Sequence, residues 1–465
     1  MATEASDVLV LGGGPAGAIA ALRAADLGAR TTLVTSNDFG GMSANDGPVP
    51  VRTLAHAARL MRDVGQLQDY GIQTSEPKLD YSVLLVRVAE VVKQVRRHST
   101  LRGQLDQAGA TIHEAAGRCR FIDERNVESP SGQQFEADKI IVCTGGQTRT
   151  LAIPGFEHVA THSDAWALKS VPRTMLVLGG GATGLQLASI FAAFGTRVTL
   201  FEAGSRLLPG EDEDVAAAVA EGFRNRGIVI HEGFGSVERF ERDGAVTRMY
   251  FSDADGQHMS EAELAVCAVG WRVDAEALAL SAAGIETDAR GYISVDEQGR
   301  TSATNIYAAG DVTGVAMLVP QAIQQGYIAA SAALGIAGPA TARQLVPAGS
   351  FTDPEYARVG PTEEKARQSA DAISVSVSFD SVTRPIIDGR TFGFCKVIAD
   401  RSSRQILGCS VVGDRAVDIV QIAAVAIAAE MRIDQLAHFP LSFPTYAGAL
   451  WQAAAKLTYR LNSAE

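Results

Sequence analysis

The sequence lacks several features that mark broad classes of protein. It has no run of 18 apolar residues, so we expect no segment that spans a bilayer. It also has no basic stripe, since 53 Asp and Glu against 41 Lys and Arg give a net charge of −12. This balance disfavours nucleic acid and anionic lipid as partners. No basic segment precedes an apolar core at the N-terminus, so we expect no signal peptide.

Cysteine is scarce, and no C-x-x-C pair occurs. The five residues are scattered along the chain, at Cys119, Cys143, Cys267, Cys395 and Cys409. This spacing argues against a metal cluster, so we expect no bound metal, and it fits reduced thiols in a cytoplasmic protein. All five stand in or beside expected strands, where a small buried side chain is the expected role.

What is present is the composition of a folded protein with several domains. Hydrophobic residues make up 46% and charged residues 20% of the 465 positions. At about 150 residues per domain, this length predicts about three domains. Two segments, residues 7–34 and 173–201, share one layout: a short β-branched run, G-x-G-x-x-G, an Ala-rich helical stretch and a second β-branched run. This is the pattern of a βαβ unit that binds a dinucleotide.

The two glycine triplets have defined roles in such a unit. The first glycine makes the tight turn, the second lets the backbone approach a pyrophosphate, and the third lets helix pack on strand. The triplets are Gly12, Gly14 and Gly17, with Pro15 and Ala16 inside the first, and Gly179, Gly181 and Gly184.

The residue at the end of each second strand differs between the two units. Ribose recognition uses an acid about 20 residues beyond the first glycine. Glu202 fills this position in the second unit, where its carboxylate could accept from both ribose hydroxyls and would repel a 2′-phosphate. The second site is therefore predicted to prefer NAD(H) over NADP(H). Thr35 replaces the acid in the first unit, which leaves one charge-assisted hydrogen bond fewer.

A third element indicates a flavin. Residues 301–314 predict a short buried strand at Ile306–Ala309 that ends in Gly310 and Asp311. A carboxylate at this place can accept a hydrogen bond from a ribityl hydroxyl, while the glycine lets the chain pass close to the cofactor.

With these elements in place, the chain resembles the pyridine nucleotide–disulfide oxidoreductases over essentially its whole length. The resemblance extends through residues 140–146, 265–274, 305–312, 351–360 and 392–400. It implies an α/β fold with two Rossmann-like dinucleotide-binding domains, for FAD and NAD(H), plus a C-terminal α+β dimerisation domain. The implied boundaries are 1–150 and 273–343 for the FAD domain, 151–272 for the NAD(H) domain and 344–465 for the interface of a homodimer. It adds further expected cofactor-binding residues: Gly41, Met42, Thr144, Gly145 and Gly270.

The chain departs from the family at the redox loop and at its partner base. The family has two cysteines separated by four residues after a Gly-Gly pair, but Ser43 and Pro48 stand at these positions. Neither side chain can form a thiolate, so disulfide exchange by the family mechanism is not available. Phe443 stands where the family has a histidine before Pro-Thr, and Gly448 stands where it has a glutamate. His438 as a relocated base is a weaker alternative than His438 as a loop histidine. Tyr446 as a contact for the acceptor is likewise weaker than Tyr446 as a structural residue.

A further departure concerns two residues that form a pair in the family. The family places a lysine after the redox loop and a glutamate after the last fingerprint glycine, and the two form an ion pair beside the flavin. Arg52 and Gln186 hold these positions. By the resemblance, Arg52 would hold developing negative charge on reduced flavin as a fixed cation, and Gln186 would keep a hydrogen-bonding amide.

The sequence therefore predicts an FAD-dependent NADH oxidoreductase that passes electrons directly to a small acceptor such as a quinone. The expected catalytic residues are Arg52, Ser43, Gln186 and Phe443. Nicotinamide transhydrogenation and NADH oxidation are the enzymatic alternatives. A non-catalytic flavin-binding subunit or regulatory relative is the alternative from another class.

Overall fold

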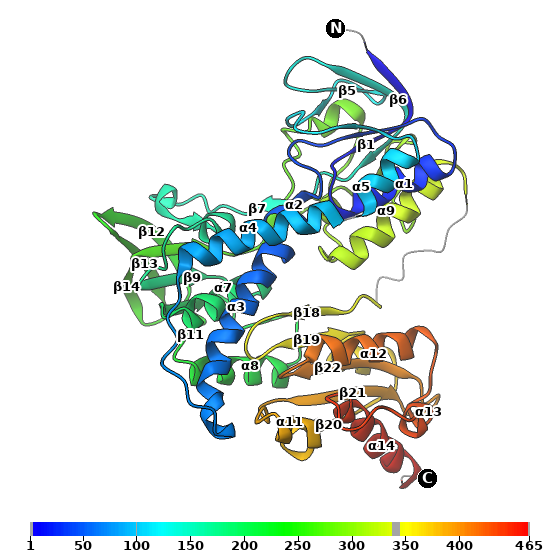
Figure 1. The fold of residues 1–465 in the computed structure, drawn as a ribbon. Coiled ribbons are helices and arrows are strands. Elements are labelled where there is room, and N and C mark those ends of the chain that lie inside the picture. The colour runs from blue at the N-terminus through cyan, green and yellow to red at the C-terminus, as the bar shows by residue number, and fades with distance from the viewer. Residues whose placement is uncertain (1–2, 99, 337–344, 464–465) are drawn as a thin grey trace. The chain divides into compact units, whose positions relative to one another are not determined.

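The computed structural model describes residues 3–98, 100–336 and 345–463 (Figure 1). These residues form two units. The first unit comprises residues 3–53, 85–149 and 270–336, and the second comprises residues 54–84, 150–269 and 345–463.

The first unit is built on a seven-stranded sheet. Its order is β3-β2-β1-β6-β5-β4, and β17 also pairs with β6. The strands β1, β2, β3, β6 and β17 run parallel, while β4 and β5 form an antiparallel arm. The strands are β1 Glu4–Leu11, β2 Thr31–Val34, β3 Thr111–His113, β4 Arg120–Phe121, β5 Asn126–Glu128, β6 Gln134–Val142 and β17 Ile306–Ala308. The strand predicted at Ile306–Ala309 is thus confirmed as β17, one residue shorter.

Helices α1 (Pro15–Asp26), α5 (Thr100–Gln107) and α9 (Val319–Ala333) pack on one face of this sheet. Glycine permits the close approach: a Cβ at Gly17 would lie 1.8 Å from the Gly12 carbonyl oxygen, and one at Gly326 would lie 2.2 Å from that of Ala16. The remaining elements are α2 Gly41–Asn45, β7 Gln147–Thr148, β16 Trp271–Arg272, η3 Leu280–Ala283 and η4 Asp311–Thr313. Helix α4 (Tyr81–His98) begins in the second unit and continues in the first.

The second unit contains a five-stranded parallel sheet of the same type. Its order is β11-β10-β9-β15-β8, and a three-stranded antiparallel sheet, β12-β13-β14, adjoins it. The strands are β8 Ala160–Thr161, β9 Thr174–Leu178, β10 Arg197–Glu202, β11 Val229–Glu232, β12 Ser236–Asp243, β13 Val246–Asp253, β14 Gly256–Ala262 and β15 Leu264–Cys267. The helices are η2 Phe156–His158, α6 His162–Trp166, α7 Ala182–Ala193 and α8 Glu213–Asn225.

A five-stranded antiparallel sheet in the order β18-β19-β22-β21-β20 completes the second unit. Its strands are β18 Ala348–Ser350, β19 Tyr356–Val359, β20 Ala372–Ser378, β21 Phe394–Asp400 and β22 Ile406–Val412. Its helices are α10 Glu363–Ser369, η5 Phe379–Ser381, α11 Thr383–Ile387, α12 Ala416–Ala428, α13 Ile433–His438 and α14 Gly448–Ser463. Two helices lie earlier in the chain, α3 Pro48–Gln66 and η1 Leu67–Tyr70. The apolar helix predicted over 419–429 corresponds to α12; Val425 on its outer side is 63% exposed.

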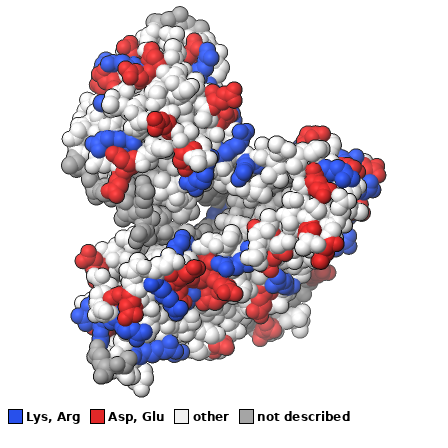
Figure 2. Space-filling model, turned by 180° about the vertical axis from the view of Figure 1, so that it is seen from behind, with Lys and Arg blue, Asp and Glu red and all other residues white. Residues whose placement is uncertain are grey.

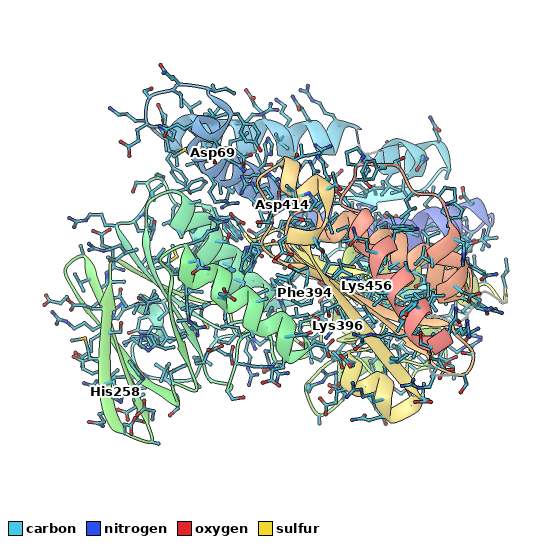
Figure 3. The ribbon with its side chains drawn as sticks, turned by 90° about the horizontal axis from the view of Figure 1, so that it is seen from below. Asp69, His258, Phe394, Lys396, Asp414 and Lys456 are labelled. Carbon is cyan, nitrogen blue, oxygen red and sulfur yellow. The ribbon has the colours of Figure 1, made fainter. Side chains whose placement is uncertain are left out.

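Strand β21 shows how alternation places one charge in the interior. Cys395 and Val397 face the apolar core against α12 and α14, so Lys396 points to the opposite side of the sheet. There its ammonium lies 2.9 Å from Asp212 and 2.7 Å from Asp214, at the start of α8 (Figure 3). The Lys396 side chain is only 3% exposed, so this ion cluster joins α8 to the antiparallel sheet.

The surface mixes charges of both signs. Figure 2 shows Lys and Arg interspersed with Asp and Glu over the face in view, without a continuous area of one sign. Exposed charges of the described residues form ion pairs, for example Arg248 with Glu261 at 3.1 Å, and such pairs contribute about 0–1 kcal/mol each. Among the helices of the described residues, none is long and apolar enough to cross a membrane.

Candidate functional site

The first fingerprint forms an anion-binding turn between β1 and α1. Gly12 has φ +108°, and a Cβ there would lie 2.2 Å from the Cys143 carbonyl oxygen, so only glycine fits. Gly14 is the N-cap of α1, and among the described residues no side chain caps this helix. Its first N–H groups therefore remain available for a phosphate oxygen, which the positive end of the helix dipole also favours. The turn fits the pyrophosphate of a dinucleotide.

The carboxyl ends of β1, β6 and β17 bring further predicted residues to the same edge. These strands are neighbours and parallel, so Gly12, Thr144 and Asp311 follow strands that end side by side. Gly145 has φ +74°, and a Cβ at Gly146 would lie 4.0 Å from the Asp311 Cβ. Burial raises the pKa of Asp311, and no described residue makes a hydrogen bond to its carboxylate. An unpaired, half-buried carboxylate at this edge fits a ligand rich in hydroxyl groups.

Thr35 lies at the end of β2, where a ribose acid was expected. Its side chain is buried, and its hydroxyl donates to the Asn37 carbonyl at 2.8 Å. The hydroxyl oxygen keeps acceptor capacity, but it carries no charge. The expected weaker hold on a ribose at this position stays a prediction.

The second fingerprint has the same form and one additional feature. Gly179 has φ +107°, and Gly181 is the N-cap of α7, again without a side-chain cap in the described chain. The Glu202 carboxylate accepts from the Gly180 N–H and the Gly204 N–H, each at 2.7 Å. Glu202 therefore stabilises the fingerprint turn itself through these hydrogen bonds. The spacing of Glu202 from the glycines alone did not predict this role. Each carboxylate oxygen retains a lone pair for a ribose hydroxyl.

The loop that replaces the redox loop packs on the first fingerprint. A Cβ at Gly41 would lie 2.6 Å from the Gly14 Cα, so α2 sits directly against the turn. Met42 follows Gly41 on α2, and the Ser43 hydroxyl donates to the Gly40 carbonyl at 3.1 Å. Gly41, Met42 and Ser43 thus share one short helix beside the first fingerprint, whereas Pro48 begins α3.

Arg96 on α4 holds this loop from the side. Its Nε donates to the Asn45 Oδ1 at 2.7 Å, and its Nη1 lies 2.9 Å from the Asp38 carboxylate. The Asn45 amide in turn donates to backbone carbonyls of the same loop. Sequence reasoning missed Arg96, since nothing in the local pattern joins it to a loop some 50 residues away.

The other predicted catalytic residues lie on two helices and one loop. Arg52 is exposed near the start of α3. Gln186 is half-buried on α7, where its amide donates to the Ala182 carbonyl at 3.3 Å. Phe443 is 82% exposed in the loop before α14. Arg52 and Ser43 belong to the first unit, and Gln186 and Phe443 to the second.

The two weaker candidates differ in access. Tyr446 is 8% exposed, stacks edge-on with Phe379 at 5.9 Å, and has its hydroxyl buried. Burial, together with the nearby Asp414 and Asp388 carboxylates, raises the pKa of Tyr446. Tyr446 therefore packs in the core of this subunit, and the weaker idea that it contacts an acceptor stays a prediction. The exposed ring of His438 bonds through Nδ1 to the Asp434 carbonyl at 2.6 Å.

Comparison with known proteins decides the family. The family model described as pyridine nucleotide-disulphide oxidoreductase matches residues 6–326, and the dimerisation-domain model of the same family matches residues 346–454. The chain belongs to the pyridine nucleotide-disulphide oxidoreductase family. Members of this family bind FAD and NAD(P)H, and the predicted α/β fold with a C-terminal dimerisation domain is confirmed.

The relatives of this oxidoreductase include a dihydrolipoyl dehydrogenase, a mercuric reductase and a disulfide reductase. It is 32% identical to dihydrolipoyl dehydrogenase 2 of Haloarcula marismortui, with 97% of each chain covered. It is 29% identical to a mercuric reductase of Lysinibacillus sphaericus, covering 96% of this chain and 82% of the relative. Among solved structures, LpdA of Mycobacterium tuberculosis superposes with a TM-score of 0.87 at 28% identity, covering 98% of this chain and 100% of LpdA. The HOCl-induced flavoprotein disulfide reductase RclA of Escherichia coli gives a TM-score of 0.85 at 27% identity, covering 97% and 99% of the two chains.

The cysteines of this family member are all inaccessible. All five are free and buried, as the sequence predicted. Burial raises the pKa of Cys119 to about 11 and that of Cys143 to about 12. Cys395 and Cys409 have sulfurs 3.9 Å apart, but they lie within the core of the antiparallel sheet at 0% exposure. Because reactivity requires an exposed thiolate, none of the five has the environment of a redox-active thiol.

Proposed function

We propose that this flavin oxidoreductase takes electrons from NADH and delivers them directly to a small acceptor such as a quinone, without a dithiol relay. One observation carries the proposal. All five cysteines are buried and none lies in residues 40–54, where the family places its redox pair. With Ser43 and Pro48 at the two cysteine positions, no thiol is available to pass electrons to a disulfide.

The proposal assigns FAD to the first fingerprint. When bound, FAD supplies the two-electron redox chemistry. The N–H groups at the start of α1 would hold its pyrophosphate, and the unpaired Asp311 carboxylate would accept from a ribityl hydroxyl. Gly41 and Met42, with Thr144 and Gly145, would bound the same cofactor. The domain boundaries inferred from the resemblance, 1–150 with 273–343 for FAD and 151–272 for NAD(H), remain part of this proposal.

The proposal assigns NADH to the second fingerprint. The N–H groups at the start of α7 would bind the pyrophosphate, with Gly184 behind them and Gly270 at the end of the domain. Glu202 favours NADH because a carboxylate braced by two backbone amides would repel a 2′-phosphate at the ribose. Gln186 on α7 would offer its amide near the nicotinamide.

Four side chains form the proposed acceptor side. The Ser43 hydroxyl is small and already satisfied by the Gly40 carbonyl, and Pro48 is apolar. Arg52 would supply a fixed positive charge that stabilises negative charge as it develops. In a homodimer built through the dimerisation domain, the exposed ring of Phe443 of the partner subunit would give the acceptor site an apolar wall. Such a surface suits a flat conjugated acceptor. As a separate part of the proposal, we place the enzyme in the cytoplasm.

Anaerobic mixing of the FAD-loaded protein with NADH tests the first half of this function. We expect flavin absorbance to bleach, and to do so faster with NADH than with NADPH. Absence of bleaching by either nucleotide would favour a non-catalytic flavin-binding relative. A preparation that stays colourless after incubation with FAD would contradict the cofactor assignment altogether.

A panel of acceptors tests the second half. The pre-reduced protein would be mixed separately with a benzoquinone, oxygen, an oxidised nicotinamide analogue and oxidised lipoamide. We expect the quinone to reoxidise the flavin fastest and lipoamide to be inert. Fastest turnover with oxygen or with the nicotinamide analogue would instead establish NADH oxidation or transhydrogenation.

A further inference from the structure

The unpaired carboxylate of Asp311 lies in a turn that a glycine begins. Gly310 follows β17 with φ +81° and ψ −155°, a backbone conformation that is nearly exclusive to glycine. A Cβ at Gly310 would lie 3.1 Å from the Cβ of Ala16 on α1 and 3.7 Å from that of Ala322 on α9. The chain therefore turns toward Asp311 in a narrow space between two helices of the first unit.

The side chain of Gln325 on α9 holds the start of this turn. The backbone hydrogen bonds between β17 and β6 end at Ala309, whose N–H donates to the Val142 carbonyl at 3.0 Å. The next N–H, that of the buried Gly310, donates to the Gln325 Oε1 at 2.8 Å. A buried backbone N–H needs an acceptor, and Gln325 supplies it here. On the other side of the turn, the Thr313 hydroxyl donates to the Gly310 carbonyl at 2.8 Å.

Helix α9 is fixed against α1, the helix of the first fingerprint (Figure 1). A Cβ at Gly326, the residue after Gln325, would lie 2.2 Å from the carbonyl oxygen of Ala16 in the first turn of α1. Farther along the two helices, the Arg23 Nε donates to the Ser331 hydroxyl at 3.0 Å. One helix thus sets the spacing between the N–H groups that would bind a pyrophosphate and the carboxylate that would bind a ribityl hydroxyl.

We propose that Gln325 is a positioning residue that fixes the Asp311 carboxylate for binding of the flavin. It acts through the Gly310 backbone and makes no contact with the cofactor. Because Gly310 and Asp311 are adjacent, loss of the Gln325 acceptor frees the turn and lets the carboxylate move away from the ribityl chain. This inference rests on the function proposed above, in which Asp311 accepts a hydrogen bond from FAD.

The dissociation constant of FAD from the protein is the readout, since it needs neither NADH nor an identified acceptor. It would be measured from the change in flavin fluorescence as FAD is added to the apoprotein. Asp311→Ala removes a charged acceptor, so we expect the constant to rise about 10- to 100-fold. Gln325→Met keeps the length of the side chain but removes its oxygen, and we expect a rise of about tenfold. Gln325→Glu keeps an acceptor oxygen and should stay within about threefold of the wild type.

A double variant separates positioning from a general loss of stability. In the Asp311→Ala background, Gln325→Met should raise the dissociation constant by less than about twofold, because residues that act through one contact give non-additive effects. Gln324→Met is the matched control, since Gln324 is the neighbouring half-buried glutamine on α9 and its side chain makes no hydrogen bond to a described residue. It should leave the dissociation constant unchanged. Gln325→Asn, which is one methylene shorter, replaces Gln325→Met if the latter fails to fold.

The outcomes separate this inference from the proposed function. A higher dissociation constant in Asp311→Ala with no change in Gln325→Met or Gln325→Asn would overturn the positioning role of Gln325. An effect of Gln325→Met that persists in full in the Asp311→Ala background, or that Gln324→Met or Gln325→Glu reproduces, would overturn it as well. An unchanged constant in Asp311→Ala would instead contradict the flavin contact given to Asp311 in the proposed function, and this inference with it.

Discussion

Replacing Glu202 with glutamine removes one charge and one hydrogen-bond acceptor from the end of β10, where the side chain reaches the turn that follows β9. The carboxylate accepts from two backbone N–H groups, of Gly180 and Gly204, each at 2.7 Å. A glutamine oxygen can accept from one of them, and its NH₂ group then faces the other donor. The unpaired N–H lowers stability in the free and the nucleotide-bound protein alike. Affinity falls because the ribose hydroxyls lose a charged acceptor, and a hydrogen bond to a charged group contributes about 1.5–3 kcal/mol. Because about 1.4 kcal/mol corresponds to a factor of ten, we expect NADH affinity to fall about 10- to 100-fold.

The same substitution changes the choice between nucleotides. Removing the negative charge also removes its repulsion of a 2′-phosphate, so the protein should lose less affinity for NADPH than for NADH. The ratio of NADH affinity to NADPH affinity should therefore become smaller. Glu202→Arg is expected to shift preference toward NADPH, but it would leave both N–H groups without an acceptor and weaken both nucleotides. Glutamine is therefore the cleaner perturbation.

Anaerobic stopped-flow measurement of flavin reduction against nucleotide concentration gives both affinities. Glu232→Gln is the control, because Glu232 pairs with Glu202 in register on the adjacent strand and likewise accepts from a backbone N–H, that of Leu207, at 2.8 Å. It should reduce stability and leave the NADH to NADPH ratio unchanged. An unchanged ratio in Glu202→Gln, or a wild-type preference for NADPH, would refute the role given to Glu202.

Three further predictions concern stability, the acceptor loop and assembly. Lys396→Met should cost about 3 kcal/mol in denaturant unfolding, because it leaves the buried Asp212 carboxylate without its cation. Burial lowers the pKa of Lys396, but hydrogen bonds to Asp214 and Asp212 outweigh this effect and raise the pKa above 10.5. The difference in the free energy of unfolding between Lys396→Met and the wild type should therefore be largest at pH 7–9 and shrink as the pH rises through the raised pKa. Arg96→Ala should raise the KM for the acceptor several-fold and leave the rate of flavin reduction by NADH unchanged. The neighbouring exposed Arg97→Ala is the control and should change neither quantity. An equal rise of the acceptor KM in the two variants would contradict the role of Arg96 in holding the loop. Light scattering at micromolar concentration should give twice the 48.9 kDa chain mass, and a monomer at that concentration would count against the dimer.

Local patterns in the sequence identified the parts of the site that depend on backbone conformation. The glycine triplets and the strand before Asp311 follow from steric requirements of a few adjacent residues, and the structure has both turns with the expected positive φ at Gly12 and Gly179. Such requirements can be read locally because the residue itself carries the constraint.

Contacts between distant segments could not be predicted in this way. Arg96 meets Asn45 across 51 positions, and Gln325 meets the Gly310 N–H across 15. The burial of Tyr446 beside Phe379, a residue of a separate element, could not be predicted either. The bracing of Gly180 and Gly204 by Glu202 was also missed, since backbone N–H groups leave no mark in the sequence. The residues that hold the site in place are thus the ones that only the structure supplies.

Turnover without thiols tests the central claim most directly. A variant with all five cysteines replaced by alanine or serine would be assayed beside the wild type for NADH–quinone and NADH–lipoamide turnover. Since none of the five is exposed, we predict quinone turnover within about twofold of the wild type and no reduction of lipoamide by either form. Loss of quinone turnover in a folded cysteine-free protein, or robust lipoamide reduction by the wild type, would contradict electron transfer directly from flavin to acceptor.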